Sequence, residues 1–228
     1  MNWLFGKTKT PDGTSIIRHS KIETRRGTAP DTTGFIEARE AAYQRLYEQP
    51  VSVSHEVFPL VPHIDVYQYR PKMKDRSICR LVTGGMSDLP MTMPRGANDA
   101  PRRVELLFYC DEPKDEYIAT LRWLAHFPHS AKTWVGCGHT VPNGDPPAPF
   151  WGSDMLDTIL FMPPILRTDA KLSQELSLDG DGVQFLWVVP LTTAECDFKL
   201  KRGFDALMDV FEQNKHPLVF DPGRKSYL

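Results

Sequence analysis

The stretch RVELLFYC, residues 103–110, decides the class of fold that the sequence predicts. It is a nearly continuous apolar run, as expected of a strand that is covered on both faces of a sheet. Two earlier stretches, HIDVYQY at 63–69 and RSICRLV at 76–82, show the alternation that is typical of strands. Two later ones, LDTILFM at 156–162 and VQFLWVV at 183–189, are again of the buried type. We therefore expect a sheet of five or more strands.

Helices are predicted before, between and after these strands. The stretch FIEAREAAYQRLYEQ has apolar residues at helical spacing and predicts a helix over 35–48. DEYIATLRWLAHF predicts a second helix over 115–127, which Pro128 is expected to end. A third helical region begins at Thr192 and Glu195, whose separation by three residues is that of a capping box, and it continues beyond a break expected at Gly203.

The order of these elements is helix, three strands, helix, long loop, two strands and helix. Strands that come in runs, rather than alternating strictly with helices, favour an α+β fold with a mixed sheet. The irregular loop covers residues 129–153, and loops of this length in compact domains are commonly functional. Residues 1–34 lack apolar periodicity. We therefore predict a flexible N-terminal arm over 1–34 and a single domain over 35–228.

The composition is that of an ordinary globular protein and argues against several classes of function. Of the 228 residues, 41% are hydrophobic and 25% are charged. The net charge of −2, with both signs spread along the chain, argues against nucleic acid as the main partner. There is no apolar run of signal-peptide or transmembrane length, so we expect a cytoplasmic protein that does not bind membranes. The four cysteines are spread singly, which fits a reducing compartment.

The stretch WLAHFPHSAKTWVGCGHT, residues 123–140, raises the hypothesis of a zinc site. It contains four residues of zinc-binding type: His126, His129, Cys137 and His139. Pro128 argues against the site, because a helix that ends there would not carry the first two histidines on one face. The single residue between the cysteine and the last histidine is also a shorter gap than in common structural sites. We therefore interpret these side chains as structural and predict neither metal nor cofactor.

A hydrolase is the second catalytic hypothesis. Cys137 or Ser153 would be the nucleophile, His139 the base, and Asp154 or Asp157 the residue that orients the base. The sequence has no nucleophile-elbow motif of the G-x-S-x-G type, and two acids near the start of a strand are most simply explained as capping and solvent-exposed residues. A zinc-dependent or Cys/Ser hydrolase thus remains the alternative, and we predict no catalytic residue.

Aromatic residues are frequent in the long loop and just after it. Trp134, Phe150 and Trp151 either pin the loop to the core or provide anchors for a partner, since Trp and Tyr are enriched at binding surfaces. The sequence favours neither interpretation.

Seven segments together resemble the Suppressor of fused domain family, in their order and in their amino-acid sequences. They are HIDVYQYRP (63–71), LVTGGMSDLPM (81–91), RVELLFYC (103–110), WLAHFPH (123–129), GHTVPNG (138–144), SDMLDTILFMPP (153–164) and LWVVPLTTAE (186–195). The resemblance covers about residues 60–228.

The resemblance implies a mixed α/β domain that acts by binding protein and not by catalysis. The animal namesake is a cytoplasmic regulator of Hedgehog signalling that sequesters zinc-finger transcription factors with the help of a second, C-terminal domain. This sequence ends with DPGRKSYL (221–228), so we expect that second domain to be absent and do not transfer that role. The chain resembles the stand-alone bacterial members, which are proposed to be immunity proteins that neutralise toxins.

The resemblance also suggests residues for a partner-binding site. In the GHTVPNG segment, His139 and Asn143 are expected to hold the loop by hydrogen bonds, while Gly138 and Gly144 supply its turns. The complete set of candidate partner-binding residues is Trp134, His139, Asn143, Trp151 and Asp154. In one binding mode, these residues would cap the active site of a toxin. In the alternative mode, an exposed strand edge of this chain would receive an extended peptide of the partner. The sequence specifies neither the partner nor the oligomeric state.

Overall fold

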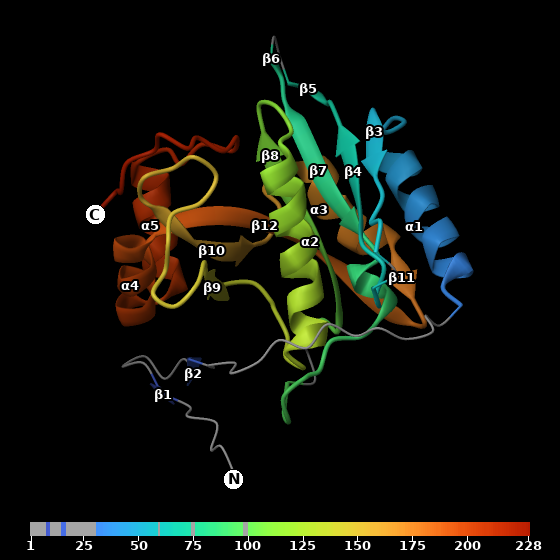
Figure 1. The fold of residues 1–228 in the computed structure, drawn as a ribbon, viewed down its shortest axis with the longest axis horizontal. Coiled ribbons are helices and arrows are strands. Elements are labelled where there is room, and N and C mark those ends of the chain that lie inside the picture. Colours follow the sequence, from blue (N-terminus) through green and yellow to red (C-terminus); the bar gives the residue numbers. More distant parts are fainter. Residues whose placement is uncertain (1–7, 10–14, 17–30, 59, 74–75, 98–99) are drawn as a thin grey trace. The chain divides into compact units, whose positions relative to one another are not determined.

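The computed structural model describes residues 8–9, 15–16, 31–58, 60–73, 76–97 and 100–228. The chain forms two compact units, a larger one from residues 23–139 and 161–189 and a smaller one that includes residues 140–160 and 190–228. Figure 1 shows their elements. The predicted arm, residues 1–34, lies mostly outside the described residues. Within it, β1 (Thr8–Lys9) pairs with β2 (Ser15–Ile16) in antiparallel orientation.

The larger unit is organised around a mixed sheet with the strand order β3-β4-β7-β8-β12. Its strands are β3 (Ser52–Ser54), β4 (Asp65–Tyr69), β7 (Cys79–Gly84), β8 (Arg103–Cys110) and β12 (Asp181–Thr192), the last three residues of which belong to the smaller unit. Neighbouring strands are antiparallel except β8 and β12, which are parallel, with Val183 opposite Arg103. The predicted α+β fold with a mixed sheet of five or more strands is confirmed, since the sheet to which these strands belong has eight.

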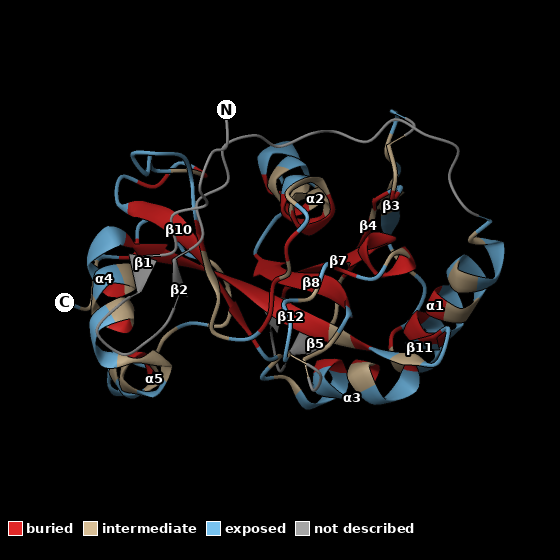
Figure 2. Ribbon diagram, turned by 90° about the horizontal axis from the view of Figure 1, so that it is seen from below, coloured by how far each residue is buried: buried red, intermediate tan, exposed pale blue. Residues whose placement is uncertain are grey.

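Helices cover both faces of this sheet (Figure 2). α1 (Thr33–Leu46) and α3 (Arg167–Glu175) lie against one face, and α2 (Asp115–Ser130) lies against the other. This arrangement explains why every residue of β8 is buried, as its apolar sequence predicted. The shorter elements are the hairpin of β5 (Lys72–Met73) and β6 (Arg76–Ser77), the 3₁₀ turn η1 (Met86–Asp88) and β11 (Ser177–Leu178), which pairs with β12. None of the described helices has the length and the apolar character needed to span a bilayer.

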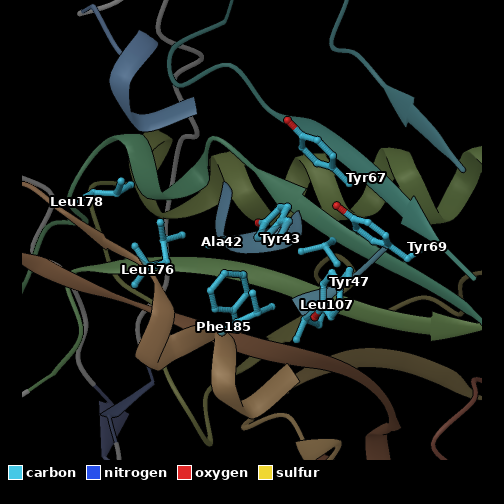
Figure 3. Close-up of a cluster of buried hydrophobic side chains, with 12 residues drawn as sticks. Ala42, Tyr43, Tyr47, Tyr67, Tyr69, Leu107, Leu176, Leu178 and Phe185 are labelled. Atoms are coloured by element: carbon cyan, nitrogen blue, oxygen red, sulfur yellow. The ribbon is translucent and has the colours of Figure 1, made fainter. Parts of the chain in front are cut away.

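The core on the α1 and α3 face is rich in tyrosine (Figure 3). Tyr43 of α1 lies near its centre with 1% of its surface exposed. Its ring packs edge-on against Tyr67 and Phe185, with centroids 5.5 and 6.0 Å away, and its hydroxyl donates a hydrogen bond to Thr83 O at 2.7 Å. The hydroxyl is thereby satisfied, which removes the main cost of burying a tyrosine.

Besides β1, β2 and the end of β12, the described part of the smaller unit contains two strands and two helices. They are β9 (Thr140–Pro142), β10 (Leu156–Met162), α4 (Thr193–Arg202) and α5 (Phe204–Gln213). β9 and β10 are antiparallel, with Val141 opposite Ile159, and the last two residues of β10 belong to the larger unit. Thr192 and Glu195 form the predicted capping box at the start of α4. Gly203, with φ of +93°, makes the predicted break before α5.

The second helix does not end at Pro128, contrary to the prediction, but continues to Ser130. Pro128 removes one backbone hydrogen bond of the helix, and its ring crowds the carbonyl of Leu124. The ring is buried, and the burial of this apolar surface offsets part of that cost. His126 and His129 therefore lie on one helix, contrary to the expectation that Pro128 separates them.

Several elements were not predicted, among them α3, β3 and β9. α3 contains few apolar residues, and β3 and β9 have three residues each, too few to show a periodicity. The predicted irregular loop, 129–153, therefore begins within the last turn of α2 and contains a strand.

Candidate functional site

The candidate site is a loop of the smaller unit that begins at the last residue of β9. Residues 142–149, PNGDPPAP, are all exposed. Four of the eight are prolines, whose fixed φ angles leave the chain little freedom to lose when a partner binds. The loop is thus exposed and stiff.

Asn143 holds this loop in shape. Its backbone N–H donates to Asp157 O at 2.7 Å, which ties the loop to β10. Its side-chain Nδ2 donates to Ala148 O at 2.6 Å, while Ala148 N donates to Asn143 O at 2.9 Å, so the two residues close the loop on itself. Gly144 supplies a turn with φ of +98°, a conformation that favours glycine. The hydrogen-bonding role predicted for Asn143 and the turn predicted at Gly144 are confirmed.

Trp151 lies beneath the surface of the smaller unit rather than on it. Only 3% of the residue is exposed, and its ring packs edge-on against Phe150 and Phe220, with centroids 4.7 and 5.3 Å away. A side chain that is already buried offers no surface to a partner. Trp151 is therefore a support for the turn that it belongs to, and its burial argues against the predicted contact with a partner.

The two acids that the hydrolase hypothesis considered, Asp154 and Asp157, have different surroundings. Asp154 is exposed, and so is Met155 at 39%. Asp157 is buried inside β10 and accepts hydrogen bonds from the hydroxyls of Thr158 and Thr193, so the prediction that it is solvent-exposed is wrong. Ser153 is buried, and its Oγ accepts hydrogen bonds from the backbone N–H groups of Met155 and Leu156, at 3.2 and 3.1 Å. Its hydroxyl thus shapes the turn that presents Asp154.

Trp134 and His139 meet in the larger unit. Their rings are 4.3 Å apart between centroids and inclined by 71°, and both residues are half-buried. Gly136 lies against the Trp134 ring, where an added Cβ would come within 3.0 Å of it. Gly138, with φ of +80°, supplies the turn predicted there, and its N–H donates to Phe161 O at 2.8 Å.

The four residues of the zinc hypothesis have separate surroundings. Nε2 of His126 lies 2.8 Å from Glu56 Oε1, and Nε2 of His129 donates to Met86 O at 3.0 Å. Cys137 is exposed, and His139 packs on Trp134. In the described part of the chain, no group of three or more His, Cys, Asp or Glu side chains could hold a metal ion.

Three carboxylates, Glu105, Asp169 and Glu195, are fully buried. The sequence reasoning missed the first two and predicted only the capping role of the third. In the larger unit, Glu105 of β8 accepts four hydrogen bonds, from Thr83 Oγ1, Gly85 N, Ser87 N and Ser87 Oγ, at 2.6 to 3.0 Å. Arg39 lies 3.9 Å from it and forms an ion pair of 2.5 Å with Asp88. The carboxylate of Glu105 therefore fixes the TGGMSD segment, residues 83–88. The sequence signal that could have indicated this buried carboxylate was the single acid within the apolar stretch RVELLFYC.

The other two buried carboxylates also pair with arginine. Asp169 of α3 lies 2.8 Å from Arg80 Nη2 and accepts hydrogen bonds from the hydroxyls of Tyr47 and Tyr109. Glu195 of α4, in the smaller unit, binds Arg224. Burial raises the pKa of Glu195, but hydrogen bonds from Arg224 and from the N–H groups of Thr192 and Tyr227 outweigh it and leave the pKa below its usual value. In each network an arginine offsets the cost of burying the carboxylate charge, so we assign the networks to structure.

Comparison with solved structures shows where this fold occurs. A putative SUFU homologue from Neisseria gonorrhoeae aligns with a TM-score of 0.62 at 19% identity, over 86% of this chain and 98% of that one. A crystal structure of the Sufu–Fu complex aligns with a TM-score of 0.53 at 12% identity, over 87% and 92%. Drosophila Suppressor of Fused aligns with a TM-score of 0.55 at 13% identity, over 85% of this chain but only 50% of that one.

Sequence comparison gives the family. No curated protein sequence matches the chain. The family model of the Suppressor of fused protein (SUFU) matches residues 61–225, well over half of the chain. The resemblance noted in the seven sequence segments is confirmed, and the chain belongs to the Suppressor of fused protein family.

Proposed function

We propose that this chain is a non-catalytic protein-binding module and that its partner is a toxin, which it neutralises as an immunity protein. The contact surface is the 142–149 loop together with the exposed turn at Asp154 and Met155. Trp134 and His139, both half-buried, are further contact candidates in the larger unit.

The observation that carries the proposal is the exposed loop closed by Asn143. Most flexible loops lose conformational entropy when they bind, which weakens the complex. Here the prolines and the hydrogen bonds between Asn143 and Ala148 have already ordered the loop in the free chain. Trp151 and Ser153 hold the neighbouring turn from beneath, so both parts of the surface are presented on a rigid base. A precedent for protein binding by this fold is Sufu, which has been crystallised in complex with Fu.

The charge of the surface indicates the character of the partner. Between Lys132 and Arg167 the sequence has no lysine or arginine, whereas it has two exposed acids, Asp145 and Asp154. An acidic surface fits a basic one, and complementary charge speeds association and fixes the orientation of the two partners. A toxin that cleaves or modifies nucleic acid has such a basic surface around its active site, since it must bind phosphates. We therefore propose a partner of this class.

Co-expression with the product of the neighbouring gene tests the proposal, because we expect that gene to encode the toxin. We expect the chain to restore growth of cells that express the toxin and to elute with it as a complex of constant stoichiometry. The control is the same cells with an unrelated toxin, whose effect the chain should not relieve. If the chain neither relieves the cognate toxin nor elutes with it, the proposed function is wrong.

A further inference from the structure

Two of the four cysteines face each other in the sheet of the larger unit. Cys79 is the first residue of β7 and Cys110 the last residue of β8, and the antiparallel register places them directly opposite. Cα atoms of opposite residues in antiparallel strands are about 4.5 to 5.5 Å apart. A disulfide needs a Cα separation of about 4.4 to 6.8 Å. The strand pairing thus already provides the separation that a disulfide requires.

The pair lies at the end of both strands, next to the solvent. Both residues are free thiols with 0% and 2% of their surface exposed. The two residues that follow Cys110, Asp111 and Glu112, are exposed. Strand ends open more easily than strand centres, because fewer contacts must break. A small reagent therefore reaches the pair by local opening at this end, without unfolding of the sheet.

The surroundings make the two thiols unequal. A hydrogen bond from Cys110 and the nearby positive charge of Arg70 lower the pKa of Cys79, although burial opposes the change. The same hydrogen bond and burial raise the pKa of Cys110. Arg70 is fixed in place by its ion pair with Glu112, in which Nη1 lies 3.2 Å from Oε1. Because thiolates and not thiols attack disulfides, the positive charge of Arg70 favours Cys79 as the attacking residue.

We propose that Cys79 and Cys110 form a reversible cross-strand disulfide by exchange with a small-molecule disulfide such as oxidised glutathione. The Cys79 thiolate attacks one sulfur of glutathione disulfide, which breaks the S–S bond, releases one glutathione thiolate and leaves a mixed disulfide. Cys110 then loses its proton to the solvent and attacks the Cys79 sulfur, which releases the second glutathione. Two protein thiols are oxidised and one glutathione disulfide is reduced to two thiols.

The bond would join two central strands of the larger unit. A chain that is cross-linked in this way has less freedom when unfolded, so oxidation should raise the melting temperature by several degrees. In a reducing compartment, disulfides of this kind are usually transient and report redox state, and a reversible exchange has that property. The proposal concerns a site in the larger unit and does not depend on the binding role of the 142–149 loop.

Equilibration of the folded chain with defined ratios of reduced and oxidised glutathione tests the proposal. The chain carries Cys137→Ser, because Cys137 is exposed and would react by itself. After the remaining thiols are alkylated, we expect mass spectrometry to find a peptide pair joined through Cys79 and Cys110, with Cys196 alkylated. Reduction should restore both thiols. Two alkylated cysteines at 79 and 110 under oxidising ratios, with the fold intact, would overturn the proposal.

Single variants test the order of the two steps. Cys110→Ala should stop the exchange at the mixed disulfide, so that glutathione accumulates on Cys79. Cys79→Ala should leave Cys110 unmodified. Arg70→Gln should slow the first step several-fold, because it removes the charge that favours the thiolate, and Arg45→Gln, which is exposed and pairs with Glu175, is the matched control. Glutathione found on Cys110 in the Cys79→Ala variant, at the rate seen for Cys79, would contradict the assigned order.

Discussion

Arg224 donates hydrogen bonds from Nη1 and Nη2 to the two carboxylate oxygens of Glu195, at 2.6 and 2.8 Å. Both side chains are buried, and the same carboxylate accepts from Thr192 N at 3.0 Å and from Tyr227 N at 3.1 Å. One acid therefore caps α4 and holds the C-terminal segment against its first turn. The smaller unit, which carries the candidate site, depends on this pair.

Arg224→Met should destabilise the fold by about 3 to 5 kcal/mol, because it leaves the charge of Glu195 buried without its partner. Chemical denaturation measures the change in the free energy of unfolding. The double variant Arg224→Met with Glu195→Gln is the control and should recover part of the loss, since the unpaired charge is then gone. Equal losses in the single and the double variant would show that the ion pair is not the cause.

His216 should make the stability of the fold depend on pH. Burial, together with the nearby charge of Arg224, lowers its pKa from 6.5 to about 4. Between these values the unfolded chain binds a proton at His216 and the folded chain does not, so the free energy of unfolding falls as the pH falls. The contribution of His216 to the free energy of unfolding is complete above pH 6.5. It amounts to at most about 3 kcal/mol, because the free energy changes by about 1.4 kcal/mol for each pH unit between the two pKa values.

The comparison of wild type with His216→Gln isolates this effect, because the other acids titrate in both chains. Denaturation at a series of pH values should give a smaller slope for the variant between pH 6.5 and about 4. Parallel curves for the two chains would mean that His216 binds its proton equally well in the folded and the unfolded state.

Trp151→Ala should cost about 3 to 5 kcal/mol of stability, as is usual for a large aromatic side chain removed from a core. Met155, four residues later, is exposed, and Met155→Ala should change stability by no more than about 0.5 kcal/mol. Thermal or chemical unfolding of the two variants provides the measurement. Similar and small losses in both would place the Trp151 ring at the surface.

The bounds of a strand could be predicted where the pattern of apolar residues within the strand determines its structure. β8 and β10 have the predicted bounds, because the apolar residues that identify each strand follow one another within the strand itself. The end of α2 was not predictable, because the burial of Pro128 depends on residues distant in sequence. α3 was missed for a related reason: it has few apolar residues and is held to the core mainly through Leu172.

The candidate site could be predicted in part. The turn glycines and the role of Asn143 follow from short-range chemistry that the GHTVPNG segment contains. The burial of Trp151 depends on Phe220, which lies some 70 positions away in the sequence and carries no local signal. Glu105 was overlooked for the same reason, since its partners Thr83, Gly85 and Ser87 come from a different strand and turn.

The central claim is that the acidic surface around the 142–149 loop binds a protein, and the most direct test is the affinity for the toxin partner measured by titration calorimetry. The double variant Asp145→Lys with Asp154→Lys should bind at least about a hundredfold more weakly, a loss of about 2.8 kcal/mol. Glu212→Lys, the reversal of an exposed acid on α5, is the control and should bind like the wild type. Full affinity in the double variant, with the fold intact, would contradict the account.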